Sequence, residues 1–185
     1  MKLSEKDALQ LAARKVSFGR GISDSTNRLV ATLHQILNSG DELQLYDAMV
    51  CVNEVKNSIE AVHNLNHELC CLAAKTYLER RYPKVDWERV SVLEKDVNAV
   101  GPDLLIEENK RIVAEVKTTE PKSTRDFGSE QKKNIKKDLD NLSSEKYSGF
   151  DRYFFVSSSK ASHILDNKYK SQYPSVNFVL LKPEA

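Results

Sequence analysis

Residues 102–119 read PDLLIEENKRIVAEVKTT, two runs rich in apolar residues on either side of a charged turn. Such runs are typical of strands, and we expect strands over residues 102–106 and 111–119. If residues 108–110 form a three-residue loop, the two strands pair as an antiparallel hairpin in a fixed register. That register predicts four cross-strand pairs: Glu107–Arg111, Ile106–Ile112, Leu105–Val113 and Leu104–Ala114.

The same register places Asp103 opposite Glu115, with their Cβ atoms about 5 Å apart. Lys117 follows Glu115 by two residues, and side chains two apart on a strand point to the same face. A slip of one residue would move Asp103 to the other face. The hairpin therefore predicts two carboxylates and one ammonium group side by side.

Two close carboxylates repel each other unless a cation lies between them, and hard oxygen ligands suit Mg²⁺ or Mn²⁺. Lys117 adds a positive charge and a hydrogen-bond donor next to Asp103 and Glu115. Hydrolysis of a phosphodiester needs a metal that ligates phosphate and activates water, and cations that stabilise the growing charge. The three residue types fit that reaction.

The short pattern of an acidic residue, any residue and lysine is not specific, because it occurs six times in the chain. Glu-Val-Lys itself occurs twice, at residues 54–56 and 115–117. The first copy falls in a helical apolar stripe, where side chains two apart diverge by about 200°. Only the second copy has a strand context and an acidic partner.

Apolar periodicity divides the chain into a helical first part and an α/β second part. The first part is helical up to about Tyr82, where Pro83 ends the run. The second part is expected to contain a strand over 90–93, the hairpin, and further elements. These are helices over 129–145 and 161–172 and strands over 152–156 and 176–181.

The element order from residue 64 onward is thus αβββαβαβ, which predicts an α/β fold with a mixed central sheet flanked by helices. Residues 1–63 are expected to form an N-terminal all-helical region, used for dimerisation or DNA contact. Residues 64–185 are expected to form the domain that carries the hairpin.

Pro102-Asp103 followed by Glu115-x-Lys117, within αβββαβ order, resembles the PD-(D/E)XK nuclease superfamily, which has the restriction-endonuclease-like fold. The resemblance covers about residues 64–181. It implies that Asp103 and Glu115 ligate Mg²⁺, for which Mn²⁺ can substitute, with the Val116 carbonyl sometimes a third ligand. It also implies that Lys117 polarises the attacking water or steadies the phosphate.

The resemblance implies further site residues on two helices. Many members add an acidic residue from the helix before the first strand, where Glu68 fits better than Glu79. Members often place a polar or basic residue on the helix after the third strand, where Gln131 is the candidate. Lys132 and Lys136 flank Gln131 and would reach DNA phosphates.

The implied function is a Mg²⁺-dependent DNA endonuclease, of restriction type (type II), acting on duplex DNA as a homodimer. Repair, recombination or junction-resolving nucleases share these features, so the sequence leaves them open. A non-catalytic DNA-binding subunit of the same fold is also left open, because Asp103, Glu115 and Lys117 could form only a surface ion pair. His63 and His67 have a spacing that can hold zinc, but two partly exposed helix histidines are the simpler interpretation.

Composition is that of a globular protein with one core: 185 residues, 40% hydrophobic and 30% charged. No stretch approaches the roughly 20 apolar residues of a membrane span, and the first residues lack a signal-peptide apolar block. We expect a cytoplasmic protein without a membrane partner.

Cys51, Cys70 and Cys71 are an odd number of cysteines without metal-binding spacing, and we expect them to be buried thiols. The last 65 residues carry 12 basic and 8 acidic residues, which permits a phosphate-rich partner.

Overall fold

The computed structural model describes residues 27, 31, 63–64, 66–92, 101–107 and 109–181. The chain divides into two compact units, one of residues 5–65 and one of residues 1–4 and 66–185, and the sheet lies in the latter. The helical region expected over residues 1–63 lies almost wholly outside the described residues. None of the helices in the described part of the chain has the length and apolar character that crossing a bilayer requires.

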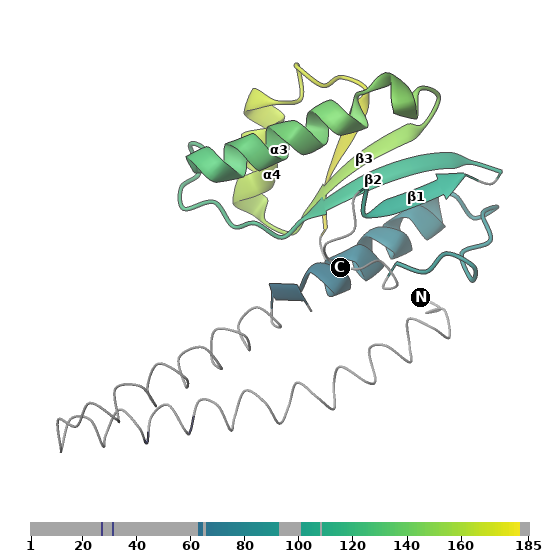
Figure 1. Cartoon of the computed structure of the whole chain (residues 1–185), viewed down its shortest axis with the longest axis horizontal. Helices are drawn as coiled ribbons and strands as arrows, with labels where there is room; N and C mark the ends of the chain where they lie inside the picture. Colours follow the sequence, from purple (N-terminus) through teal and green to yellow (C-terminus); the bar gives the residue numbers. More distant parts are fainter. Residues whose placement is uncertain are drawn as a thin grey trace. The chain divides into compact units, whose positions relative to one another are not determined.

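Four strands form one mixed sheet in the order β1-β2-β3-β4 (Figure 1). They are β1 (Leu104–Glu107), β2 (Arg111–Lys117), β3 (Asp151–Val156) and β4 (Val176–Leu180). β1 pairs antiparallel with β2, whereas β2–β3 and β3–β4 are parallel. The parallel pairs need long crossover connections, and helices supply them. The predicted α/β class with a mixed sheet is confirmed.

The register of the β1–β2 hairpin is the predicted one. Leu104 pairs with Ala114, Leu105 with Val113, Ile106 with Ile112, and Glu107 with Arg111. Because side chains alternate along a strand, this register fixes which residues of β2 face each side of the sheet.

Helices cover both faces of the sheet (Figure 1). A helix over residues 66–81 lies on one face, where Tyr77 makes edge-on ring contacts with Tyr153 and Phe155 of β3. It ends before Pro83, as predicted. α3 (Ser129–Leu142) and α4 (Ser159–Lys168) lie on the other face, and a short 3-10 helix (Glu145–Tyr147) follows α3.

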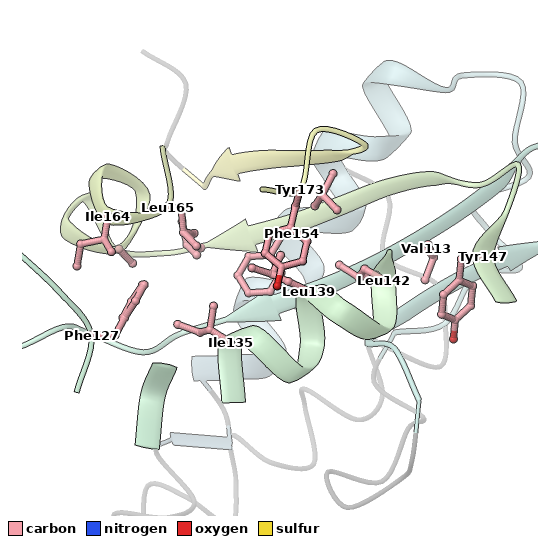
Figure 2. Packing of buried hydrophobic residues seen from close by; sticks show 13 residues of the cluster. Val113, Phe127, Ile135, Leu139, Leu142, Tyr147, Phe154, Ile164, Leu165 and Tyr173 are labelled. Atoms are coloured by element: carbon pink, nitrogen blue, oxygen red, sulfur yellow. The ribbon is translucent and has the colours of Figure 1, made fainter. Parts of the chain in front are cut away.

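The core under α3 and α4 is built from their apolar stripes and from β2 and β3 (Figure 2). Ile135, Leu139 and Leu142 of α3 pack toward Val113 and Phe154 of the sheet. Because β2 is the second of four strands, with a neighbour on each side, its residues are buried from Ile112 to Val116. Any polar side chain on this strand therefore sits in a largely apolar setting.

The strand predicted over residues 90–93 is wrong for residues 90–92, which adopt no strand; Leu93 lies outside the described residues. The Val90 carbonyl accepts a hydrogen bond from the buried Lys75 ammonium. Val92 is buried at 8% exposure. Val90 and Ser91 are partly exposed, so the run that favoured a strand is a partly buried irregular segment, and periodicity in so short a segment does not separate burial from pairing. The described elements therefore run α-β-β-α-β-α-β, with the 3-10 turn aside.

Candidate functional site

Asp103 sits directly before β1, at the point where the hairpin closes on β2. Its Oδ2 accepts a hydrogen bond of 2.7 Å from the backbone N–H of Val116. This bond fixes the carboxylate beside the strand that carries Glu115 and Lys117. The hairpin thus sets the position of Asp103 through the main chain.

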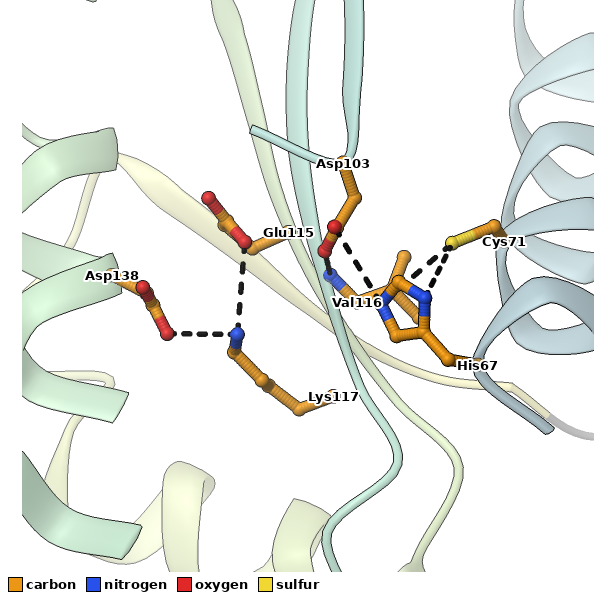
Figure 3. A network of polar contacts seen from close by, with 7 residues as sticks. All are labelled: His67, Cys71, Asp103, Glu115, Val116, Lys117 and Asp138. Carbon is orange, nitrogen blue, oxygen red and sulfur yellow. Dashed lines mark hydrogen bonds and ion pairs between the residues drawn. The ribbon is translucent and has the colours of Figure 1, made fainter. Parts of the chain in front are cut away.

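Glu115 and Lys117 lie on the same face of β2, the face covered by α3 and α4. Glu115 is opposite Phe154 of the core, and Lys117 is opposite Val156. The Lys117 Nζ is 3.8 Å from the Glu115 carboxylate. Figure 3 shows Asp103 next to Glu115, with the amine of Lys117 also beside Glu115.

A third carboxylate, that of Asp138, enters the site from α3. Its Oδ2 is 2.8 Å from the Lys117 Nζ, shorter than the distance from Nζ to Glu115. The side chains of Lys117 and Asp138 are 27% and 21% exposed. A mostly buried ammonium is therefore held next to two acidic side chains from different elements.

On the opposite side of Asp103 lies His67, from the helix over residues 66–81 (Figure 3). Its Nε2 is 3.5 Å from Asp103 Oδ1. The Cys71 sulfur lies 3.7 Å from His67 Nδ1, one helical turn further on. Asp103 is thus contacted by a backbone amide on one oxygen and by an imidazole on the other.

The surroundings of the two carboxylates of the hairpin shift their pKa values in opposite directions. Burial opposes ionisation of Asp103, but the His67 contact, the Val116 N–H and the Lys117 charge hold its pKa below the ordinary value. Burial, together with the charges of Asp103 and Asp138, raises the pKa of Glu115 to about 8. The pair therefore holds one proton near neutral pH, which is typical of two acids that share one site.

Lys117 stays charged in this setting. Burial acts to lower its pKa, but the hydrogen bond to Asp138 and the charges of Asp138, Glu115 and Asp103 outweigh burial and raise the pKa. The site therefore offers a cation next to an acid that keeps its proton near neutral pH, and a further positive charge would favour loss of that proton.

The raised pKa of Glu115 makes a prediction for the metal-free protein. The folded state binds this proton more tightly than the unfolded state, in which the pKa is near 4.5. The stabilising contribution is complete below that value and is lost as pH rises through about 8, so the free energy of unfolding should fall over this range. Urea denaturation of wild type and Glu115→Gln in chelator, at pH 5 to 9, measures it. Parallel pH profiles for the two proteins would contradict it.

Glu68 lies on the same helix as His67 and is buried, with 7% exposure. A carboxylate buried on this helix, one residue from His67, is withheld from bulk water. Its assignment as an acidic residue of the catalytic site stays a prediction.

The residues predicted on α3 have mostly local contacts. The Gln131 Oε1 accepts the Gly128 N–H at 3.1 Å, which caps the start of α3. Lys132 pairs with Asp126, which also binds Lys168. At about 100° per residue, Lys132 lies about 120° around the helix from Asp138, so it is held on another flank. Lys136 is exposed, and its contact with DNA stays a prediction.

Sequence reasoning missed His67 and Asp138 as members of the site. Asp138 follows Gln131 by seven residues, close to two full turns, so it lies on nearly the flank that was assigned to Gln131. That spacing, applied along the whole of α3, could have found it. For His67 the signal was weaker, since its contact with Asp103 depends on how the helix packs against the hairpin.

The donor atoms of the site are carboxylate oxygens. Within the described ranges, no group of three or more His, Cys, Asp and Glu side chains is arranged to hold a metal ion. Mg²⁺ commonly uses one or two protein carboxylates and completes its shell with water and substrate phosphate. Asp103 and Glu115 provide two carboxylates of this kind, and the charge of Asp103 helps to raise the pKa of Glu115.

Comparison of the chain with protein-family models, with curated proteins and with solved structures found no match. The function must therefore be inferred from the chemistry of the site itself.

Proposed function

We propose that this protein is a Mg²⁺-dependent DNA endonuclease of the PD-(D/E)XK type, with its active site at Asp103, Glu115 and Lys117. The observation that carries the proposal is the placement of two electrostatically coupled carboxylates beside a charged lysine, on the buried strand β2 and the hairpin that closes on it. Burying this set of charges is costly for stability alone.

Asp103 and Glu115 would hold the metal, and a bound Mg²⁺ would ligate the phosphate and lower the pKa of its water. Glu115 would have to lose its proton to act as a ligand. Asp103 is already ionised and is kept in place by the Val116 N–H. The folded hairpin thus prepares one charged ligand and one ligand that ionises on binding.

Lys117 would supply the positive charge that the reaction needs at the phosphate. Its ammonium lies 3.8 Å from Glu115, so it reaches the surroundings of any group bound there. Negative charge grows on the phosphate oxygens as water attacks, and a preplaced cation stabilises that charge. This separates the role of Lys117 from that of the two acids.

DNA is the proposed substrate, duplex DNA first. α3 carries Lys133, Lys136 and Lys137, all exposed, on the helix that also brings Asp138 to the site. Exposed lysines close to a hydrolytic site can pair with backbone phosphates without reading sequence. A homodimer would place two such sites on the two strands of a duplex.

A cleavage assay on a panel of nucleic acids tests the proposal. Supercoiled plasmid, linear duplex, a four-way junction and single-stranded DNA are incubated with Mg²⁺, Mn²⁺ or chelator. We expect metal-dependent nicking or linearisation of the plasmid, absent in Glu115→Gln. Cleavage of the junction alone would instead make the protein a junction-resolving nuclease.

Salt-sensitive DNA binding without cleavage under any metal condition would favour the non-catalytic DNA-binding subunit. If the protein neither binds nor cleaves DNA under any of these conditions, the nuclease proposal is contradicted.

A further inference from the structure

We propose that Asp138 of α3 is a positioning residue, which fixes the ammonium of Lys117 next to the carboxylate of Glu115. The inference rests on the proposed function, since it assigns a role within that same site. It adds a residue outside the hairpin to the machinery, contributed by a helix that packs on the sheet.

The distances carry the inference. The Lys117 Nζ is 2.8 Å from Asp138 and 3.8 Å from Glu115, so the closer partner of the amine is the acid of α3. A lysine side chain has four rotatable bonds and is costly to order, so an amine without a close partner samples many positions. Asp138 removes that freedom by contacting the amine from a second direction, different from that of Glu115 (Figure 3).

The packing of α3 and the burial of the ion pair explain why Asp138 stays in contact with Lys117. Ile135, Leu139 and Leu142 anchor α3 in the core, and Leu139 directly follows Asp138 in the chain. The helix backbone at residue 138 is therefore rigidly placed with respect to β2. The ion pair is three-quarters buried, which protects it from the screening that weakens surface pairs.

Position on the helix separates Asp138 from the other charged residues of α3. Lys132 pairs with Asp126 on another flank, and Glu130 is exposed in the first turn. In the described part of the chain, Asp138 is the one α3 residue that forms an ion pair with β2. A positioning residue acts through another group, so its effect must vanish when that group is removed.

A double-mutant cycle tests this requirement. Asp138→Asn keeps the shape and loses the charge, and we expect it to lower single-turnover cleavage at saturating Mg²⁺ by 10- to 100-fold, as expected for a group that orients a catalytic one. In a Lys117→Met background the same change should alter cleavage by less than about twofold. Glu130→Gln, an identical loss of charge on the same helix, should leave cleavage unchanged.

Two further readouts do not depend on activity. The ¹H–¹⁵N signal of the Lys117 ammonium, assigned with Lys117→Met, should be lost or displaced in Asp138→Asn and intact in Glu130→Gln. Mn²⁺ affinity measured by calorimetry should change by less than about threefold, because a positioning residue does not ligate the metal.

Asp138→Glu, which keeps the charge, should recover cleavage to within about tenfold of wild type.

Equal losses from Asp138→Asn in both backgrounds would overturn the inference, because Asp138 would then act independently of Lys117. An unchanged Lys117 signal would overturn it too. A loss of Mn²⁺ affinity of tenfold or more would make Asp138 a ligand instead. If wild type cleaves no substrate, the nuclease proposal fails, whereas the Lys117 signal still decides whether Asp138 fixes the amine.

Discussion

Replacing Asp103 by Asn should reduce DNA cleavage by on the order of 10³-fold, because a metal-held phosphate accounts for several kcal/mol of transition-state stabilisation and each 1.36 kcal/mol is tenfold in rate. An asparagine oxygen can still accept the Val116 N–H that Asp103 accepts at 2.7 Å. The hairpin should therefore stay folded while the charge is lost. Rates are measured under single turnover with saturating Mg²⁺, with calorimetry of Mn²⁺ binding alongside.

Glu107→Gln is the matched control, since it removes an acid from the same hairpin at an exposed position of β1. It should cleave like wild type. Wild-type rates for Asp103→Asn, or equal losses in both variants, would contradict the assignment of Asp103.

Replacing Lys117 by Met should lower cleavage by on the order of 10²- to 10³-fold, the effect of removing one preplaced donor from a charge-stabilising site. Methionine keeps the unbranched apolar stem, so packing against the core is largely preserved. Unlike Asp103→Asn, this variant should bind Mn²⁺ as tightly as wild type or more tightly, because a positive charge 3.8 Å from Glu115 is gone.

Lys84→Met, at an exposed loop position, controls for the loss of a lysine. Full activity in Lys117→Met would show that the ammonium takes no part in the reaction. A parallel loss of Mn²⁺ affinity and activity would show that Lys117 acts on metal binding rather than on the phosphate.

The hairpin was predictable because one local feature, the length of its loop, determines how its strands pair. A three-residue loop over residues 108–110 selects the register in which Leu105 pairs with Val113, and a slip of one residue would move Asp103 to the other face. Asp103 then follows without any knowledge of the remaining fold, since it directly precedes β1. Local geometry in the chain is enough for this part of the site.

His67 and Asp138 could not be reached in the same way, because their positions depend on how helices dock against the sheet. Helical periodicity identifies the apolar face of α3, Ile135 and Leu139, but not which flank lies over Lys117. That choice is made by packing against β2 and β3, between residues far apart in sequence. Tertiary contacts of this kind leave little trace in local periodicity.

At residues 90–92 the sequence predicted a strand that the structure does not contain. Val90 and Val92 have the side chains of a strand, yet burial and the Lys75 hydrogen bond to the Val90 carbonyl account for them without a strand partner. β-Branched residues favour a pleated, half-buried surface, and a buried irregular segment satisfies the same preference for burial. Short apolar runs therefore predict burial more securely than pairing.

Diffraction from crystals soaked in Mn²⁺, with anomalous data collected at the manganese edge, tests most directly whether this is a metal-dependent hydrolytic site. We predict an anomalous peak within about 2.3 Å of carboxylate oxygens of both Asp103 and Glu115, with its remaining ligands largely water. Data from crystals soaked at high Mn²⁺ concentration that show no peak between these two side chains, or a peak only elsewhere in the molecule, would contradict the proposed active site.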